Sequence, residues 1–378
     1  MKLALVHDWL NQIGGAEDVL EVLVGMYPDA PIFTSIYGPD IMPERYQAWD
    51  IHPLWMDRLP AVHQRHQAYL AIYPFAWQGL DLSDYDVILS NKSGFCHGFK
   101  KGAESVHVCY CLAPTRYVWQ LDHYIQREGM GKVVGGVLKP LIAYLKGWDY
   151  RAAQKVDHFI AISTEIQQRI KTYYDRDSDI IYPPVDTSRF RPVTAEAVED
   201  YFLIISRLVP YKQIDLAVQA ATRLGLPLKI GGQGRDIDRL KGMAGETVEF
   251  LGYVPDEALG PLMAKAKAFI FPGLEDFGIT PVQAQAAGRP VIAYQGGGAL
   301  DTVIEGETGV FFAEMTVDHL SEALAHFDAS RYEQAVIRKN ALRFDQKIFE
   351  AQIEAYLRQA WEAKLAGQNF MWRDPIQV

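Results

Sequence analysis

The chain has 378 residues, of which 49% are hydrophobic and 22% charged, and it carries a net charge of −10. This length favours two domains, and the composition provides enough apolar material for two cores. The negative charge argues against a general nucleic-acid binder, because such proteins need surplus Lys and Arg to displace counterions.

The start of the chain and its cysteines favour a cytoplasmic protein. No apolar run reaches the length that spans a bilayer. The first residues reach His7 and Asp8 too early to form the apolar stretch of a signal peptide. Three Cys give an odd count and no disulfide framework, which fits a reducing compartment.

The first half of the chain begins with a strand and a helix. Leu3 to Val6 is an apolar strand, Gly14-Gly15 is a loop, and apolar residues then recur at helical spacing. Further strands are predicted over 84–90, 105–111 and 160–163. Ser163 is well placed to cap the helix that follows the last of these.

The second half repeats this alternation after a connector that contains three Pro, residues 181–193. A last helix is predicted over 345–366. The predicted strands lie at 201–206, 228–230, 248–251, 268–271, 290–294 and 309–312.

Repeated alternation of strand and helix implies parallel sheets covered on both faces. We therefore predict an α/β protein with two Rossmann-like domains that face a cleft. The predicted domains are 1–185 and 186–345, followed by a helical segment, 346–378, that packs back on the first domain.

Two basic residues follow the first strand of the second domain. The segment SRLVPYK places Arg207 and Lys212 at the carboxyl end of strand 201–206. Ligands of such folds bind at this edge of the sheet, and the two cations would neutralise a diphosphate there. Two basic residues alone are more often a solvated loop.

The segment AFIFPGLEDFGITPVQAQAAGRPVIAY predicts an anion site beside a carboxylate. Strand 268–271 leads to a loop with Glu275, and a helix begins near Ile279. Gly278 permits close backbone approach, and the amides of the first helical turn would hold phosphate oxygens. Gln283 would then reach the nucleoside. Taken singly, Glu275 is equally an acid favoured by the helix dipole.

The loop Gly14-Gly15 precedes another helix, so it would approach the same phosphates from across the predicted cleft. Two adjacent glycines are more often only a turn.

Three other motifs are poor matches to cofactor sites. The pair Gly232-x-Gly234 lacks the third glycine of a dinucleotide site, since Ile237 occupies its place. The acidic run DRDSD, 175–179, is interpreted as a turn between a helix and a strand. Cys109-x-Cys111 has the wrong spacing for zinc, and buried strand cysteines are the better interpretation. No metal and no cofactor are expected.

Together these segments resemble glycosyltransferase family 4, a retaining family with the GT-B fold. The resemblance is carried by SRLVPYK, FLGYVPDEAL, EDFGITPVQAQAAGRPVIA, GGG at 296–298 and ETGVFF. VHDWLNQIGGAE and CYCLAPTRYVW are similar to its bacterial exopolysaccharide and O-antigen branch, whose members are group 1 glycosyltransferases. The resemblance implies that the first domain binds the acceptor and the second the nucleotide-sugar donor.

The resemblance also implies roles for single residues. Arg207 and Lys212 match the pair that binds the donor diphosphate, and Glu275 matches a Glu that contacts the transferred sugar. The loop Tyr253-Val254 matches the segment beside the base. Such enzymes retain the anomeric configuration, and chemistry with a leaving diphosphate needs cations and helix dipoles more than a protein base. The backbone that lines the sugar and phosphates comes from Phe277, Gly278, Ile279 and Thr280.

Two positions depart from the family pattern. The second family Glu, which holds the ribose hydroxyls, is here Gln283, and the family His after CYC is here Leu112. His97 is a candidate for supplying an imidazole to the same site, although a partly exposed loop histidine is the more common situation.

A basic stretch suggests a membrane partner. Residues 100–155 hold nine Lys or Arg against four acids, a local excess of 9 − 4 = 5 positive charges. An interfacial segment that presents basic residues to anionic lipid has this pattern, and so does an ordinary amphipathic helix. Pro140 weakens any single long helix here. The basic residues are Lys100, Lys101, Arg116, Arg127, Lys132, Lys139, Lys146, Arg151 and Lys155.

The function predicted is transfer of a hexose from a nucleoside-diphosphate sugar to a saccharide or lipid-linked acceptor in polysaccharide biosynthesis. A UDP-glucose-like donor is the first choice and GDP-mannose the second. A nucleotide-sugar epimerase of the same double-Rossmann plan is the alternative enzyme. A non-catalytic nucleotide-sugar sensor is the alternative from another class.

Overall fold

The chain forms two compact units in the computed structural model, which describes residues 1–120 and 132–376 and only the backbone of 132–138. Unit 1 comprises Met1–Tyr182 together with Phe349–Val378, and unit 2 comprises Pro183–Ile348. The predicted domain boundaries, after 185 and after 345, lie close to these limits. Each unit is an α/β layer structure, as the alternation of strands and helices predicted.

Unit 1 contains a seven-stranded sheet in the order β3-β2-β1-β4-β5-β6-β7, in which every neighbouring pair is parallel. Every residue of β1, β4 and β5 is buried, as expected where helices cover both faces of a sheet. The strands are β1 (Leu3–His7), β2 (Ile32–Thr34), β3 (Ile51–Pro53), β4 (Val87–Lys92), β5 (Val106–Cys111), β6 (His158–Ala161) and β7 (Ser178–Ile180). The helices are α1 (Gly15–Met26), α2 (Val62–Arg65), α3 (Tyr73–Gln78), α4 (Arg116–Trp119), α6 (Lys132–Ala153) and α7 (Thr164–Tyr174).

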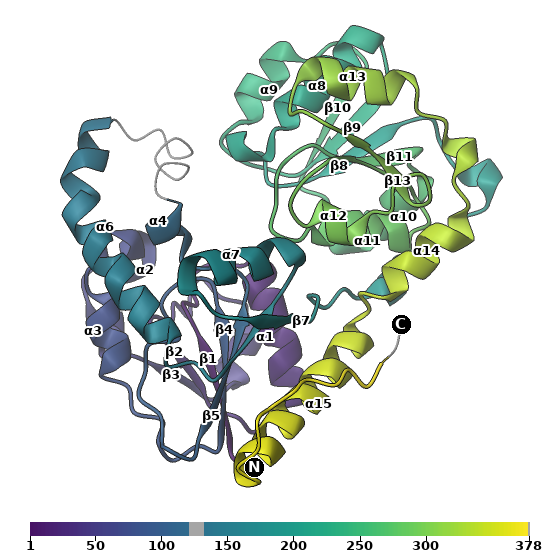
Figure 1. The fold of residues 1–378 in the computed structure, drawn as a ribbon. Coiled ribbons are helices and arrows are strands. Elements are labelled where there is room, and N and C mark those ends of the chain that lie inside the picture. Colours follow the sequence, from purple (N-terminus) through teal and green to yellow (C-terminus); the bar gives the residue numbers. More distant parts are fainter. Residues whose placement is uncertain (121–131, 377–378) are drawn as a thin grey trace. The chain divides into compact units, whose positions relative to one another are not determined.

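Unit 2 contains a six-stranded parallel sheet in the order β10-β9-β8-β11-β12-β13. Helices α8, α9 and α13 cover one face of this sheet, and α10, α11 and α12 cover the other (Figure 1). The strands are β8 (Phe202–Ile205), β9 (Leu228–Gly231), β10 (Val248–Gly252), β11 (Ala268–Phe271), β12 (Val291–Tyr294) and β13 (Gly309–Phe312). The helices are α8 (Ile214–Leu224), α9 (Ile237–Met243), α10 (Asp256–Lys265), α11 (Ile279–Ala286), α12 (Ala299–Thr302), α13 (Val317–Ala325) and α14 (Gln334–Leu342).

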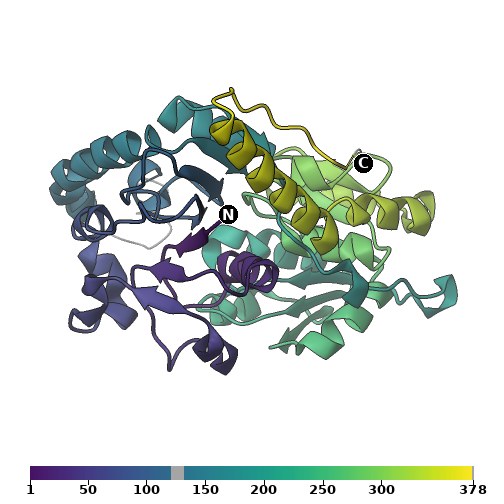
Figure 2. The ribbon, with the colours of Figure 1, turned by 90° about the horizontal axis from the view of Figure 1, so that it is seen from below.

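Helix α15 (Gln346–Leu365) returns to unit 1, as predicted. Its Phe349 packs edge-on against Tyr110 of β5, and the Tyr356 hydroxyl donates to Asp179 of β7 over 2.8 Å. The chain beyond the helix folds back along it (Figure 2), and Trp372 packs against the Tyr356 ring at 4.8 Å. Aromatic side chains therefore hold α15 and the residues after it against the sheet of unit 1.

Most predicted elements are confirmed, and two differences stand out. Strands β2 and β3 have only three residues each, which is too short for a periodic signal, and the prediction missed them. The expectation that Pro140 weakens a single long helix is wrong, because α6 continues through it. Ser163 caps α7 by accepting a hydrogen bond from the Ile166 amide over 3.2 Å, as predicted. Among the described residues, no helix combines the length and hydropathy that crossing a bilayer requires.

Candidate functional site

The carboxyl edge of the unit 2 sheet brings three predicted residues together. Strands β8 and β11 are hydrogen-bonded neighbours, so the loops that follow them lie side by side. Lys212 follows β8 and Glu275 follows β11, and the Lys212 ammonium forms an ion pair with the Glu275 carboxylate. The side chains are 14% and 23% exposed, respectively. Arg207 is exposed, and its guanidinium donates to the Tyr211 hydroxyl over 3.1 Å. The edge therefore presents two cations and one carboxylate.

Glycines hold the loop after β8 in place. A Cβ at Gly232, whose φ is +131°, would lie 1.8 Å from the Ser206 carbonyl oxygen. A Cβ at Gly234 would lie 2.1 Å from the Leu208 carbonyl oxygen. The pair Gly232-x-Gly234 is thus explained by backbone packing beside Arg207, which agrees with the absence of a third glycine.

A second glycine group supports the loop that carries Glu275. A Cβ at Gly297 would lie 2.3 Å from the Glu275 carbonyl oxygen, and one at Gly298 would lie 2.1 Å from the Phe277 Cα. The Gly298 amide donates to the Glu275 carbonyl oxygen over 2.9 Å. The GGG motif at 296–298 was part of the family resemblance, but no role was predicted for it, because the residues that it contacts, Glu275 and Phe277, are distant in sequence.

Helix α11 begins at Ile279, one residue after Gly278, whose φ of +100° favours glycine. Gly278 has no side chain that could cap the amides of the first turn, which includes Thr280. Such amides bind anions. Gln283 lies on the same helix and is half-buried. The predicted donor-binding segment thus forms the loop after β11 and the first turns of α11.

Buried amides anchor the far side of this helix. The Gln285 side chain donates to the Thr302 carbonyl oxygen over 2.8 Å and accepts from the Asn340 amide over 2.7 Å. Gln285 is fully buried, so this helix end is fixed by α12 and α14. Sequence patterning did not identify these supporting residues.

The loop Tyr253-Val254 follows β10, at the same edge of the sheet. The Tyr253 ring is 69% exposed, whereas Val254 packs on Gly231, where a Cβ would lie 2.7 Å from its Cγ2. An exposed aromatic ring in the loop next to the end of β9 is a surface on which a nucleotide base can stack.

In unit 1 the loop Gly14-Gly15 lies beside a buried carboxylate. Gly14 precedes the first turn of α1, and Glu17 in that turn lies 3.4 Å from the Nε2 atom of His7. Asn91 completes this cluster, since its amide lies 3.2 Å from the His7 Nδ1 atom and donates to the Ala16 carbonyl oxygen. A buried carboxylate thus lies in the first turn of the helix whose N-terminus was predicted to hold phosphate.

Asp8 organises the neighbouring loop of unit 1. Its carboxylate accepts hydrogen bonds from the backbone amides of Ser93, Gly94 and Cys96, over 2.6, 2.5 and 2.8 Å. These bonds fix the turn that follows β4 at the carboxyl edge of the sheet. Trp9 packs over Gly94, where a Cβ would lie 2.6 Å from the indole.

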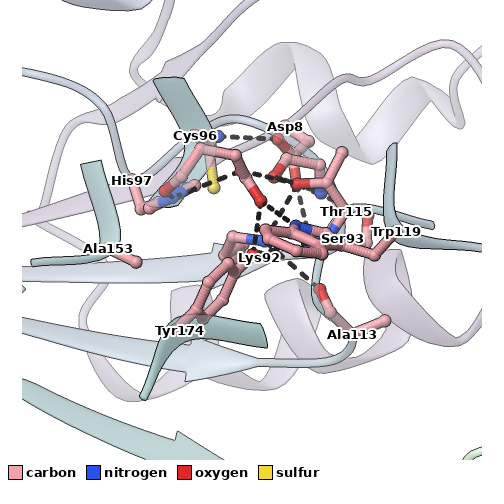
Figure 3. A network of polar contacts seen from close by, with 12 residues as sticks. Asp8, Lys92, Ser93, Cys96, His97, Ala113, Thr115, Trp119, Ala153 and Tyr174 are labelled. Atoms are coloured by element: carbon pink, nitrogen blue, oxygen red, sulfur yellow. Dashed lines mark hydrogen bonds and ion pairs between the residues drawn. The ribbon is translucent and has the colours of Figure 1, made fainter. Parts of the chain in front are cut away.

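A network of buried charged and polar side chains stands next to this turn (Figure 3). Lys92, at the end of β4, donates to the Ala113 carbonyl oxygen and the Thr115 hydroxyl, each over 3.3 Å. Asp149 of α6 accepts from the hydroxyls of Thr115 and Tyr174, each over 2.8 Å, and from the Trp119 indole over 2.6 Å. Burial lowers the pKa of Lys92, but the nearby Tyr174 and Asp149 more than offset this effect and hold that pKa well above its usual value.

The structure does not place His97 on the surface. The expectation of a partly exposed loop histidine is wrong, because its side chain is fully buried and its Nε2 lies 3.3 Å from the Asp149 carbonyl oxygen. Burial and the nearby Lys92 hold the pKa of His97 well below its usual value, so the ring is neutral. We therefore leave His97 out of the catalytic set proposed below. Leu112 is buried in the turn after β5.

The cysteine and acidic motifs have structural explanations, as interpreted from the sequence. Cys109 and Cys111 are buried in β5, and His107 on the same strand bonds to the Ser90 hydroxyl over 2.8 Å. Asp175 and Asp177 in the turn after α7 each lie 3.2 Å from the Lys171 ammonium. In the part of the chain that the structure describes, no group of three His, Cys, Asp or Glu could hold a metal ion.

Two parallel sheets, each with polar loops at its carboxyl edge, define the fold class of this protein. It is the GT-B fold of glycosyltransferases. The structure aligns with the Anabaena protein HepE, solved with UDP and glucose, at a TM-score of 0.67 and 18% identity, covering 94% of this chain and 98% of that one. Sucrose-phosphate synthase from Thermosynechococcus elongatus aligns at a TM-score of 0.69 and 18% identity, covering 95% and 100%.

The family follows from sequence comparison. The model described as Glycosyltransferase Family 4 matches residues 13–189, and the model described as Glycosyl transferases group 1 matches residues 186–344. The chain belongs to family 4, among the group 1 glycosyltransferases.

Curated relatives match over a part of their length. A GDP-mannose-dependent phosphatidylinositol monomannoside mannosyltransferase of Mycobacterium tuberculosis is 31% identical over 205 residues, which is 46% of this chain and 53% of that protein. A D-inositol 3-phosphate glycosyltransferase of Streptomyces scabiei is 24% identical over 272 residues, 62% and 58%. The chain thus spans about half the length of these relatives.

Proposed function

We propose that this protein is a retaining glycosyltransferase that transfers a hexose from a nucleoside-diphosphate sugar to a saccharide or lipid-linked saccharide in polysaccharide biosynthesis. The observation that carries the proposal is the ion pair of Lys212 and Glu275 at the loop that leads to α11, with Arg207 on the same loop as Lys212. A leaving diphosphate needs positive charge and aligned amides, and this edge of the sheet supplies both.

Each group at this edge has a distinct role in the proposal. Arg207 and Lys212 bind the diphosphate oxygens, and the amides from Phe277 to Thr280 add partial positive charge. Glu275 accepts hydrogen bonds from hydroxyls of the transferred sugar. Gln283 takes the place from which the family binds ribose, and Tyr253-Val254 lies against the base.

The donor is proposed to be a UDP-hexose or GDP-mannose. The sequence argument put a UDP-glucose-like donor first, and the HepE structures with UDP and UDP-glucose are consistent with it. The names of the mycobacterial relatives, at 31% identity, favour GDP-mannose. The proposal therefore keeps both donors.

Calorimetric titration against UDP-glucose, GDP-mannose and their nucleoside diphosphates tests the donor site. One donor should bind, and Arg207→Ala and Lys212→Ala should each weaken binding at least tenfold, since each removes a charge-assisted contact. Lys241→Ala, an exposed lysine on α9, is the matched control. Binding that is equal in all variants would disprove this assignment.

The reaction type needs a separate measurement. A transferase releases nucleoside diphosphate slowly until an acceptor is added, whereas an epimerase converts the donor without any acceptor. Nuclear magnetic resonance of the donor and product anomeric protons distinguishes these outcomes and reports retention. Donor binding with neither reaction would favour a sensor.

We also propose a cytoplasmic location, with peripheral contact to an anionic membrane through the basic stretch. Lys139 is exposed on α6, and Lys146 lies 5.4 Å from the Trp119 ring. Arg127 lies outside the described residues, and the Lys132 side chain is not described. The metal-independent reaction remains part of the proposal.

A further inference from the structure

The β9 loop, residues 232–236, lies between two loops of the proposed donor site. In the sheet of unit 2, β9 is paired with β10 on one side and with β8 on the other. The loop after β10 carries Tyr253, and the loop after β8 carries Arg207. Two strand spacings, about 10 Å, separate these outer loops. A nucleotide whose base lies at Tyr253 and whose diphosphate lies at Arg207 must therefore cross the β9 loop.

Backbone hydrogen bonds fix the β9 loop on both sides. The Gly232 amide donates to the carbonyl oxygen of Gly252, at the end of β10, over 2.7 Å. On the other side, the Leu208 amide donates to the Gln233 carbonyl oxygen over 2.9 Å. The Leu208 carbonyl oxygen accepts from the Asp236 amide over 3.0 Å. The loop is therefore held in place before any ligand binds.

The β9 loop presents two polar side chains. Asp236 is buried, and the Arg239 guanidinium donates to both of its carboxylate oxygens, each over 2.7 Å. Two further positions are glycine. Gln233 and Arg235 are exposed, so a ligand on this edge can reach them. Because the backbone beneath them is fixed, little entropy is lost when they bind a ligand.

We infer that Arg235 selects the base of the donor and that this base is guanine, an inference that rests on the donor site proposed above. The guanidinium is a fork of N–H donors without an acceptor. Guanine has two adjacent acceptors, O6 and N7, that fit this fork. In uracil an N–H donor separates the two carbonyl oxygens, and in adenine an amino group lies beside N7. The fork therefore matches GDP better than UDP or ADP.

Calorimetric titration with four nucleoside diphosphates tests the base contact. GDP should bind at least tenfold more tightly than UDP and ADP, because a bidentate contact discriminates against a base that lacks both acceptors. The analogue 7-deaza-GDP lacks only the N7 acceptor, and it should bind about tenfold more weakly than GDP. UDP that binds as tightly as GDP, or 7-deaza-GDP that binds equally well, would overturn the inference.

Variants then locate the contact. Arg235→Ala should weaken GDP binding about tenfold and change UDP binding by less than about twofold, so that the preference for GDP is lost. Arg223→Ala, an exposed arginine in the last turn of α8, is the matched control. Equal weakening of GDP and UDP would mean that Arg235 contacts the diphosphate. Unchanged binding of both would place Arg235 away from the donor, and either result contradicts the inference.

Failure of this inference is distinguishable from failure of the proposed function. Arg207→Ala should weaken GDP and UDP alike, because it removes a contact to the diphosphate that both share. If the unchanged protein binds neither nucleotide, the donor site itself is wrong. If it binds both equally and Arg207→Ala weakens both, the donor site stands and only the selection of guanine is refuted.

Discussion

The Lys212 ammonium contacts the Glu275 carboxylate, so an ion pair joins the loop after β8 to the loop after β11. Both side chains are largely covered, and the pair is therefore less screened than a surface ion pair. A diphosphate that binds Lys212 competes with Glu275 for the same ammonium. We expect diphosphate binding to release the carboxylate towards the hydroxyls of the transferred sugar.

Glu275→Ala separates nucleotide binding from transfer. Removing the carboxylate frees Lys212, so the affinity for the nucleoside diphosphate alone should stay equal or rise by a few fold. Transfer should fall about 100-fold or more, because a contact to the reacting sugar is lost. Calorimetry and initial rates measure the two effects, with Glu246→Ala at an exposed turn as the control. A variant with normal transfer would exclude Glu275 from the site.

Gln283→Glu restores the residue that the family pattern has at this position. A carboxylate accepts from ribose hydroxyls by charge-assisted bonds, which are about twice as strong as neutral ones. The variant should therefore bind the nucleotide sugar several-fold more tightly, and Gln283→Ala should bind it more weakly. Titration with nucleoside diphosphate and with free sugar phosphate tells whether the gain involves the nucleoside. No difference among the three proteins would place Gln283 away from the donor.

Removing one of the two buried charges of Lys92 and Asp149, which the Thr115 hydroxyl bridges, should cost more stability than removing both. Lys92→Met or Asp149→Leu leaves one buried charge unpaired, at a cost of about 3–5 kcal/mol in the free energy of unfolding. The double variant should lose clearly less than the sum of the single losses. Urea unfolding measures all three, and additive losses would show that the two charges do not interact.

Acid should lower the free energy of unfolding, because two histidines are buried in their neutral form. Burial lowers the pKa of His107 from 6.5 to about 3, and the pKa of His97 is lowered in the same direction. Between pH 6.5 and 3 these histidines bind protons more readily in the unfolded chain than in the folded chain. Their effect on the free energy of unfolding is therefore absent above pH 6.5, and the free energy of unfolding falls as the pH falls towards 3. The slope for each histidine is about 1.4 kcal/mol per pH unit.

His107→Gln tests this slope, because its amide can still bond to the Ser90 hydroxyl. The free energy of unfolding, measured by urea from about pH 7.5 to 5, should fall less steeply in the variant than in the unchanged protein. His319→Gln, at an exposed position in unit 2, is the control. Parallel curves would mean that His107 titrates alike in both states.

Anionic vesicles should retain the protein at low salt if the basic stretch meets a membrane. Each lysine near such a surface contributes about 1 kcal/mol, so Lys139→Glu should weaken binding by more than tenfold. Neutral vesicles and Lys241→Glu are the controls, and sedimentation measures the bound fraction. A protein that stays in the supernatant at low salt with anionic vesicles would rule out the membrane contact.

The sequence predicted the fold where its signals are local. Strand β13 has the bounds that its apolar run predicted, and the Ser163 cap follows from its position before an amphipathic helix. Gly298 was noticed, but its role depends on the Phe277 backbone, which no local pattern reveals. His97 was misjudged because its burial is produced by contacts with Asp149 and Trp148, far along the chain.

Because unit 1 is built from both ends of the chain, its completion depends on the order of synthesis. A ribosome makes the residues of β1 before unit 2 and most of those of α15 after it. Unit 2 can therefore fold while translation continues. In the sheet of unit 1, Tyr110 lacks its contact with Phe349 until α15 has been made. A stalled nascent chain that ends before Phe349 should expose β5 and β6 to chaperones and proteases.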